Sequence, residues 1–181
     1  MDPVPVVFVA GAGGDWRVER IAPVRGEALP FAPRLARLEG VQGGDVRGIW
    51  TLRGTTSHER YVARAEKEAL RAVQPPLGRA DSTRAALIPV RKSKEWWELA
   101  QDERRRIFEE QSRHISIGLR YLPAVARRLY HCRDLAGPFD FLTWFEYGES
   151  DAERFEELVG ELRRSPEWEY VEREVDVRLS R

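Results

Sequence analysis

The 181-residue sequence contains very little sulfur: one cysteine and one methionine, which is the initiator. A single cysteine excludes an intrachain disulfide, a CxxC redox pair and a cysteine-rich zinc site. Cysteine and methionine are the most easily oxidised side chains. Their scarcity fits either codon bias, in a chain rich in arginine, alanine and glycine, or avoidance of an oxidant. Both interpretations stay open at this point.

The chain also lacks net charge and long apolar runs. Its 30 basic and 30 acidic residues balance, whereas nonspecific nucleic-acid binding needs clustered excess lysine and arginine. The apolar run at residues 4–10 is short, follows no basic residue and leads into four small residues, so it does not resemble a signal peptide or a membrane span. We therefore expect a soluble cytoplasmic protein with no nucleic-acid or membrane partner.

The hydrophobic pattern predicts an α+β fold. Helices are expected at residues 58–73, after a capping Ser57, at 152–164, and in one long helix that begins at Asp102 and is bent or ended by Pro123. The first two expected strands read as a hairpin, and residues 25–46 as a long loop. The expected strands are residues 4–10, 16–23, 48–54, 83–93, 127–134, 139–147 and 170–179.

The order of these elements predicts two related halves. From residue 83 onward the order is β-α-β-β-α-β, the ferredoxin-like unit. We interpret residues 1–82 as a second ferredoxin-like unit that has lost its first helix. We expect one compact structure made of a shortened N-terminal half (1–82) and a C-terminal half (83–181).

Of the three histidines, His114 is the strongest candidate for chemistry, because its spacing to Ile107, Gln111 and Gly118 places it on the inward stripe of the long helix. It can be a satisfied core histidine or a ligand of a metal or haem iron. A polar helix start around His58 and a strand position for His131 favour ordinary structural roles for the other two.

Two charged residues could support His114. Glu167 lies in an aromatic run, where it can be a solvated acid or the acceptor for the second imidazole N–H of a metal-bound histidine. Lys92 shares strand parity with Ile88 and Val90, so it is either half-buried beside a counter-charge or a strand-end lysine in water.

Arg127 begins the strand RRLYHCRD, with Leu129 and His131 on its face. In the partner strand, Thr143 and Phe145 share one face. An arginine above such an apolar wall is costly unless it binds an anion, and the alternative is an exposed arginine at a strand edge. No P-loop, dinucleotide-binding glycine pattern, HExxH motif or nucleophile elbow is present.

Several stretches of the chain, taken together, resemble the chlorite dismutase family. The match runs from about residue 48 to the C-terminus, and the length resembles the family's small-subunit, dimeric lineage. The stretches are WTLRG (50–54), RYV (60–62), ALIPVRKS (86–93) with Trp96-Trp97, YLP (121–123), FDF (139–141) and EWEYV (167–171).

The resemblance implies a dimeric α+β barrel that binds haem b in its C-terminal half. By position it implies His114 as the iron ligand, Glu167 and Lys92 as its partners, and Arg127 as the catalytic arginine. The family's remaining positions fall on Gln74, which would hold that arginine, on the distal pocket residues Leu129, Thr143 and Phe145, and on the propionate contacts Tyr61 and Trp96.

The implied activity is decomposition of chlorite to chloride and dioxygen by a cytoplasmic homodimer, with detoxification as its role. Arg127 would retain the hypochlorite-level fragment. Three alternatives stay open: a haem peroxidase, a relative that decarboxylates coprohaem, and a non-enzymatic haem carrier. The missing distal acid–base pair disfavours the first, and Arg127 disfavours the second.

Overall fold

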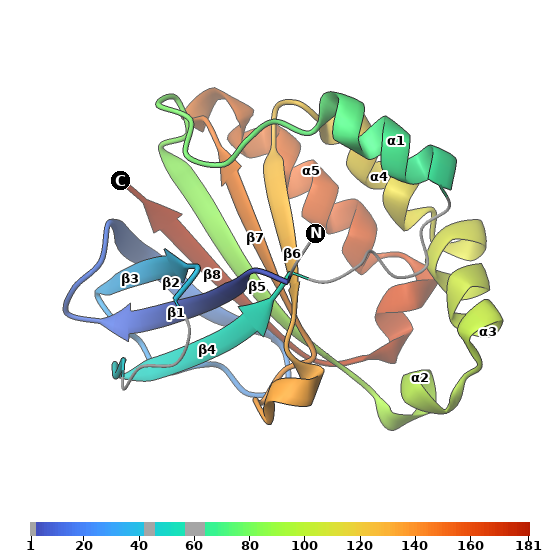
Figure 1. Cartoon of the computed structure of the whole chain (residues 1–181), viewed down its shortest axis with the longest axis horizontal. Coiled ribbons are helices and arrows are strands. Elements are labelled where there is room, and N and C mark those ends of the chain that lie inside the picture. Colours follow the sequence, from blue (N-terminus) through green and yellow to red (C-terminus); the bar gives the residue numbers. More distant parts are fainter. Residues whose placement is uncertain (1–2, 42–45, 57–63) are drawn as a thin grey trace.

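The computed structural model describes residues 3–41, 46–56 and 64–181. Within these residues, eight antiparallel strands close into a barrel in the order β1-β3-β2-β8-β5-β7-β6-β4, which confirms the α+β class (Figure 1). The strands are β1 (Pro5–Gly11), β2 (Trp16–Arg25), β3 (Arg34–Glu39), β4 (Trp50–Thr55), β5 (Arg84–Lys92), β6 (Ala126–His131), β7 (Phe141–Tyr147) and β8 (Val171–Ser180).

The predicted hairpin of the first two strands is wrong. Strand β3, which falls inside the expected loop at residues 25–46, lies between β1 and β2 and pairs with both. Half of its six residues are charged, and Leu35 is its one fully buried side chain, so the apolar alternation is weak. With β3 included, the barrel consists of two four-strand sets with the matching orders β4-β1-β3-β2 and β8-β5-β7-β6.

Helices cover the outer face of the C-terminal strands. The helices α1 (Arg64–Val73), α4 (His114–Tyr121) and α5 (Ala152–Arg163) lie on the side of β5–β8 away from β1–β4 (Figure 1). In α5, Phe155, Leu158, Val159 and Leu162 are buried at spacings of one, three and four residues, which defines an amphipathic helix. Among the described helices, none is long and apolar enough to span a membrane.

The sheet of β5, β7 and β8 separates two apolar clusters. The cluster inside the barrel includes Phe8, Tyr130, Cys132 and Trp144. The cluster between the sheet and the helices joins Ile88, Val90 and Phe145 of the strands to residues of α4 and α5. The sheet therefore has an inner face that is closed core and an outer face available for a site.

The predicted long helix is interrupted, so its continuity from Asp102 to Pro123 is wrong. The segment contains α3 (Gln101–Arg105), a π-helical turn (Arg106–Gln111) and a break at Arg113, whose φ of 54° is left-handed. A short helix, α2 (Lys94–Glu98), precedes it. Gln111 is exposed, and His114 begins α4 rather than lying late in a continuous helix.

Glu109 explains why a new helix begins at this point. Its carboxylate accepts the backbone N–H of Ile115 at 2.7 Å and the hydroxyl of Ser116 at 2.8 Å. A carboxylate that caps the first turn satisfies N–H groups that a helix start leaves without intrahelical partners. The restart at His114 is therefore fixed by a specific acid, and Gly118 still lies one turn after His114 on the same face.

Candidate functional site

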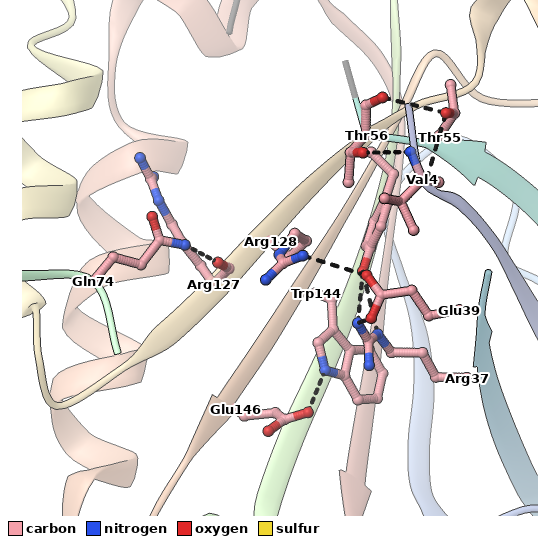
Figure 2. Close-up of polar contacts among 11 residues, drawn as sticks. Val4, Arg37, Glu39, Thr55, Thr56, Gln74, Arg127, Arg128, Trp144 and Glu146 are labelled. Atoms are coloured by element: carbon pink, nitrogen blue, oxygen red, sulfur yellow. Dashed lines mark hydrogen bonds and ion pairs between the residues drawn. The ribbon is translucent and has the colours of Figure 1, made fainter. Parts of the chain in front are cut away.

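The candidate site occupies the outer face of β6 and β7. Their register places Arg127 opposite Phe145 and Leu129 opposite Thr143, so the four side chains share one face, as strand alternation predicts. Figure 2 shows Arg127 and Arg128 leaving β6 on opposite sides, with Arg128 directed to Glu39. The expected apolar wall around Arg127 is therefore present.

A buried chain of three side chains lies at the end of this face. The Nδ1 atom of His114 is 2.7 Å from Oε2 of Glu167, and the other oxygen of Glu167 is 2.7 Å from Nζ of Lys92. The histidine begins α4, the lysine ends β5 and the glutamate lies on a 3-10 turn (Pro166–Tyr170). Three segments distant in sequence thus converge on one carboxylate.

Glu167 is ionised in this arrangement. Its side chain is 5% exposed, and burial alone would raise its pKa, but the charges and hydrogen bonds of Lys92 and His114 lower that pKa to about 2. An ionised carboxylate accepts hydrogen bonds and donates none, so Nδ1 of His114 carries the proton. The alternative interpretations, a solvated Glu167 and a Lys92 in water, are both wrong.

Aromatic rings enclose the lysine. Its Nζ lies 4.5 Å from the ring centroid of Trp96 and 5.4 Å from that of Trp168, within the range of a cation–π contact. Its backbone N–H donates to Asp140 at 2.8 Å. Lys92 is therefore fixed at both ends, which holds the counter-charge of Glu167 in place.

Three residues of the site were not identified from the sequence. The ring of Phe108 stacks on His114 at 4.4 Å, the ring of Trp168 lies parallel to it at 6.5 Å, and the hydroxyl of Ser112 accepts the backbone N–H of Glu167 at 2.8 Å. Phe108 and Ser112 lie within six residues of His114, so their closeness to that histidine in the sequence is the signal that could have identified them. Trp168 is the neighbour of Glu167 in the EWEYV stretch.

Gln74 and Gly118 contact Arg127 from two sides. The amide of Gln74 donates to the backbone carbonyl of Arg127 (Figure 2), so the contact between these residues is made to the main chain. A Cβ atom at Gly118 would lie 2.9 Å from Nη1 of Arg127. The guanidinium therefore lies directly over the backbone of α4, one turn beyond His114.

These residues fit a haem group. A single imidazole whose second N–H is bound by a carboxylate is an arrangement with which proteins hold haem iron. The side of β6 that carries Arg127 exposes Leu129 by 45%, an apolar surface of the kind that a porphyrin covers.

The remaining predicted positions lie around this centre. Thr143 is half-buried, Phe145 is buried, and Trp96 is 1% exposed beside Lys92. Propionate binding by Trp96 stays a prediction. Tyr61, Ser57 and His58 lie outside the described residues. Among the residues that are described, no group of three or more histidine, cysteine, aspartate or glutamate side chains could hold a bare metal ion.

Comparisons with known proteins agree with this geometry. The chlorite dismutase family model matches residues 45–181. The crystal structure of the dimeric chlorite dismutase from Nitrobacter winogradskyi is 57% identical, covers 97% of this chain and 99% of that one, and superposes with a TM-score of 0.90.

More distant relatives share the fold. Chlorite dismutase from Candidatus Nitrospira defluvii, solved in complex with imidazole, has a TM-score of 0.68 at 21% identity, and the match covers 98% of this chain and 91% of that one. The chlorite dismutase of Ideonella dechloratans is 36% identical over 86 residues, which span 48% of this chain and 28% of that protein. At this sequence identity, the similarity to the Nitrospira protein supports the fold alone. The similarity to the Ideonella protein covers only part of the chain.

Proposed function

Because the chain belongs to the chlorite dismutase family, a family of haem-dependent enzymes, we propose that it decomposes chlorite to chloride and dioxygen on a haem b held by His114. The observation that carries the proposal is the buried chain of His114, Glu167 and Lys92 beside an arginine on an apolar sheet face. When bound, haem would supply redox-active iron for the oxygen-atom chemistry of chlorite.

On the helix side, His114 would ligate the iron through Nε2. The Nδ1–H group donates a hydrogen bond to Glu167, which fixes the tautomer and the ring orientation and makes the imidazole a stronger electron donor. Lys92 balances the carboxylate charge, so that the acceptor stays ionised without solvent. Phe108 and Trp168 restrict rotation of the imidazole by packing against it.

On the sheet side, Arg127 would bind the substrate anion. Its guanidinium is always charged and offers several N–H donors, so it can hold chlorite and then the hypochlorite-level fragment by charge-assisted hydrogen bonds. One anion enters and one leaves with neutral dioxygen, so the reaction needs no net proton transfer. An apolar wall of Leu129, Thr143 and Phe145 around one cation suits this task better than the proton transfers that peroxide requires.

We also propose the finer architecture and assembly that the family implies. The matching strand orders of β1–β4 and β5–β8 support two ferredoxin-like halves, at residues 1–82 and 83–181. The similar Nitrobacter protein is described as dimeric, which supports a homodimer for this chain. Light scattering after size-exclusion chromatography tests the dimer, and a monomeric mass would refute it. The cytoplasmic location stays a prediction.

The decisive experiment loads the protein with haem, adds chlorite and follows oxygen with an electrode. Arg127→Ala should lower the rate of oxygen release by about 10²-fold, the loss of one preorganised donor, and should increase hypochlorite trapped by a scavenger. Arg128→Ala is the matched control, because that arginine leaves the opposite side of β6. Full turnover without extra hypochlorite in Arg127→Ala would remove this residue from the mechanism.

A second variant tests the ligand. His114→Ala should abolish stable haem binding, and an unchanged haem spectrum would refute the assignment. The wild-type result also separates the alternatives. Haem binding with no oxygen from chlorite would indicate a carrier, whereas turnover of peroxide alone would indicate a peroxidase.

A further inference from the structure

We propose that Arg25 of β2 is a positioning residue for the 3-10 turn that carries Glu167 and Trp168. The proposal rests on the proposed function, because it takes Glu167 as the partner of a haem-ligating His114. It assigns a role in the site to a strand that contributes none of the residues described above. Arg25 acts through the main chain of the turn rather than on haem or substrate.

The guanidinium of Arg25 binds the C-terminal end of this turn. Its Nη1 donates to the main-chain carbonyls of Trp168 at 2.7 Å and of Val171 at 3.0 Å. Carbonyls at the end of a helical turn lack partners within the turn, and hydrogen bonds from a charged donor are among the stronger ones in proteins. One nitrogen of Arg25 therefore joins the end of the turn to the first residue of β8.

A β-bulge in β2 directs Arg25 to the turn. Pro23 pairs with Val175, which belongs to the cluster inside the barrel, and strand alternation alone would give Arg25 the same orientation as Pro23. The register shifts between these two residues, so that Arg25 pairs with Glu174. Glu174 accepts the indole N–H of Trp168 and therefore lies on the side of the turn. The bulge thus changes the face on which Arg25 lies, as bulges beside functional sites commonly do.

The other contacts of the turn link its position to the histidine. The backbone N–H of Glu167 donates to the hydroxyl of Ser112 at 2.8 Å, so Ser112 fixes the start of the turn and Arg25 fixes its end. The Glu167 carboxylate binds Nδ1 of His114, and the Trp168 ring lies parallel to the imidazole. Because the turn has only five residues, a shift of its end changes the direction of both side chains.

The contact of Arg25 does not occupy the space proposed for haem. The turn lies on the Nδ1 side of the imidazole, whereas the iron would be bound by Nε2 on the opposite edge of the ring. The same contact can therefore be tested in the haem-free and in the haem-loaded protein.

Arg173 of β8 provides a matched control. Its guanidinium donates to the main-chain carbonyls of Glu27 at 2.9 Å and Ala28 at 3.2 Å, so it also joins β8 to the β2 side through two carbonyls. It lies 4.7 Å from the ring centroid of Phe139 as well, so its loss should lower the overall stability at least as much as the loss of Arg25. Because its acceptors lie outside the turn, Arg173→Ala separates a general loss of stability from an effect on the turn.

The first measurement needs no haem. Hydrogen exchange of the haem-free protein, followed by mass spectrometry, reports how often the turn opens. In Arg25→Ala, the amides of Glu167 and Val171 should exchange about tenfold faster, as expected for the loss of one charge-assisted hydrogen bond. In Arg173→Ala, these amides should exchange as in the wild type. Unchanged exchange in Arg25→Ala, or equal acceleration in both variants, would overturn the proposal.

The second measurement is the ferric/ferrous midpoint potential of the haem-loaded protein. A carboxylate held against Nδ1 increases electron donation by the imidazole, which favours ferric iron. Displacement of Glu167 in Arg25→Ala should therefore raise the potential, whereas Arg173→Ala should leave it unchanged. Faster exchange of the turn with an unchanged potential would also overturn the proposal, because Arg25 would then stabilise the turn without positioning the carboxylate.

Failure of the proposed function gives a different result. A wild-type protein that binds haem but releases no oxygen from chlorite would refute the activity. Both measurements on Arg25→Ala would still report on the link between Arg25 and Glu167.

Discussion

Among the buried carboxylates of the described residues, Glu167 and the pair formed by Glu174 and Asp176 define two groups that look alike and are built differently. Glu167 lies between Lys92 and the imidazole of His114. Glu174 and Asp176, on β8, are almost fully buried as well, but arginines neutralise them. Arg163 donates to Glu174 at 2.8 Å and to Asp176 at 2.9 Å, and Arg178 also pairs with Asp176.

The difference between the groups lies in what their partners can do. A guanidinium stays protonated and binds no metal, so the arginines around Asp176 act only as fixed positive charges, and the group serves to join α5 to β8. An imidazole can ligate a metal with one nitrogen while it donates with the other. A buried carboxylate therefore indicates a candidate site through the identity of its partner, rather than through its burial.

One residue connects the two groups. The indole N–H of Trp168 donates to Glu174 at 2.6 Å, and the ring of Trp168 lies parallel to that of His114. The arginine-neutralised group thus fixes an aromatic side chain that limits the movement of the histidine. Three substitutions test how separate the two groups are.

The largest effect is expected for Glu167→Gln. This change leaves the buried Lys92 without a counter-charge, and breaking such a pair costs about 3–5 kcal/mol of unfolding free energy. Replacing the charged acceptor of His114 with a neutral amide should also weaken haem binding about 10–100-fold. Urea unfolding and haem titration measure the two effects. The exposed Glu169, on the same turn, provides the control Glu169→Gln, and equal results for both variants would contradict the assignment of Glu167.

Asp176→Asn should lower stability by a smaller amount, about 1–3 kcal/mol, without changing the haem spectrum. Burial alone would raise the pKa of Asp176, but the hydrogen bonds and charges of Arg178 and Arg163 lower it overall. A lowered native pKa stabilises the fold above the ordinary carboxyl value of about 4, and this contribution is lost as the pH falls below it.

The pH dependence of the unfolding free energy provides a second test of Asp176→Asn. The loss of unfolding free energy between pH 7 and pH 3 should be smaller in Asp176→Asn than in the wild type. An equal loss in the two proteins would show that Asp176 does not contribute in this range. A changed haem spectrum would show that the two carboxylate groups are not functionally separate.

The smallest effect is expected for Trp168→Phe. It removes one hydrogen bond to Glu174, worth about 1 kcal/mol, and keeps an aromatic ring beside His114. Because Arg163 still binds Glu174, that carboxylate keeps a partner. Stability should fall slightly and haem affinity should stay within about twofold. A large loss of haem affinity would show that the indole hydrogen bond itself fixes the histidine.

The sequence predicts local features of this molecule better than contacts between distant segments. Alternation in β6 and β7 correctly places Arg127, Leu129 and Phe145 on one face, because a strand period of two is a local property. Strand β3 escaped prediction because its pairing with β1 and β2, rather than its own weak pattern, makes it a strand.

Prediction of the candidate site was limited in the same way, because its contacts join segments that are distant in the sequence. A gap of 53 residues separates His114 from Glu167, and the glutamate lies on a short 3-10 turn without a periodic signal. Nothing local distinguishes it from a solvated acid, so its role could be inferred only through the family resemblance. The break at Arg113 depends on Glu109 as a cap, which a pattern of apolar spacings does not reveal.

The separation of the two faces of the sheet also affects how long the protein can stay active in the presence of an oxidant. Burial raises the pKa of the Cys132 thiol to about 12, so the reactive thiolate is scarce, and the residue lies inside the barrel with Tyr130 and Trp144. Strand β6 and its neighbours stand between these side chains and Arg127. The sheet therefore separates the thiol and the rings inside the barrel from an oxidant released on the Arg127 side.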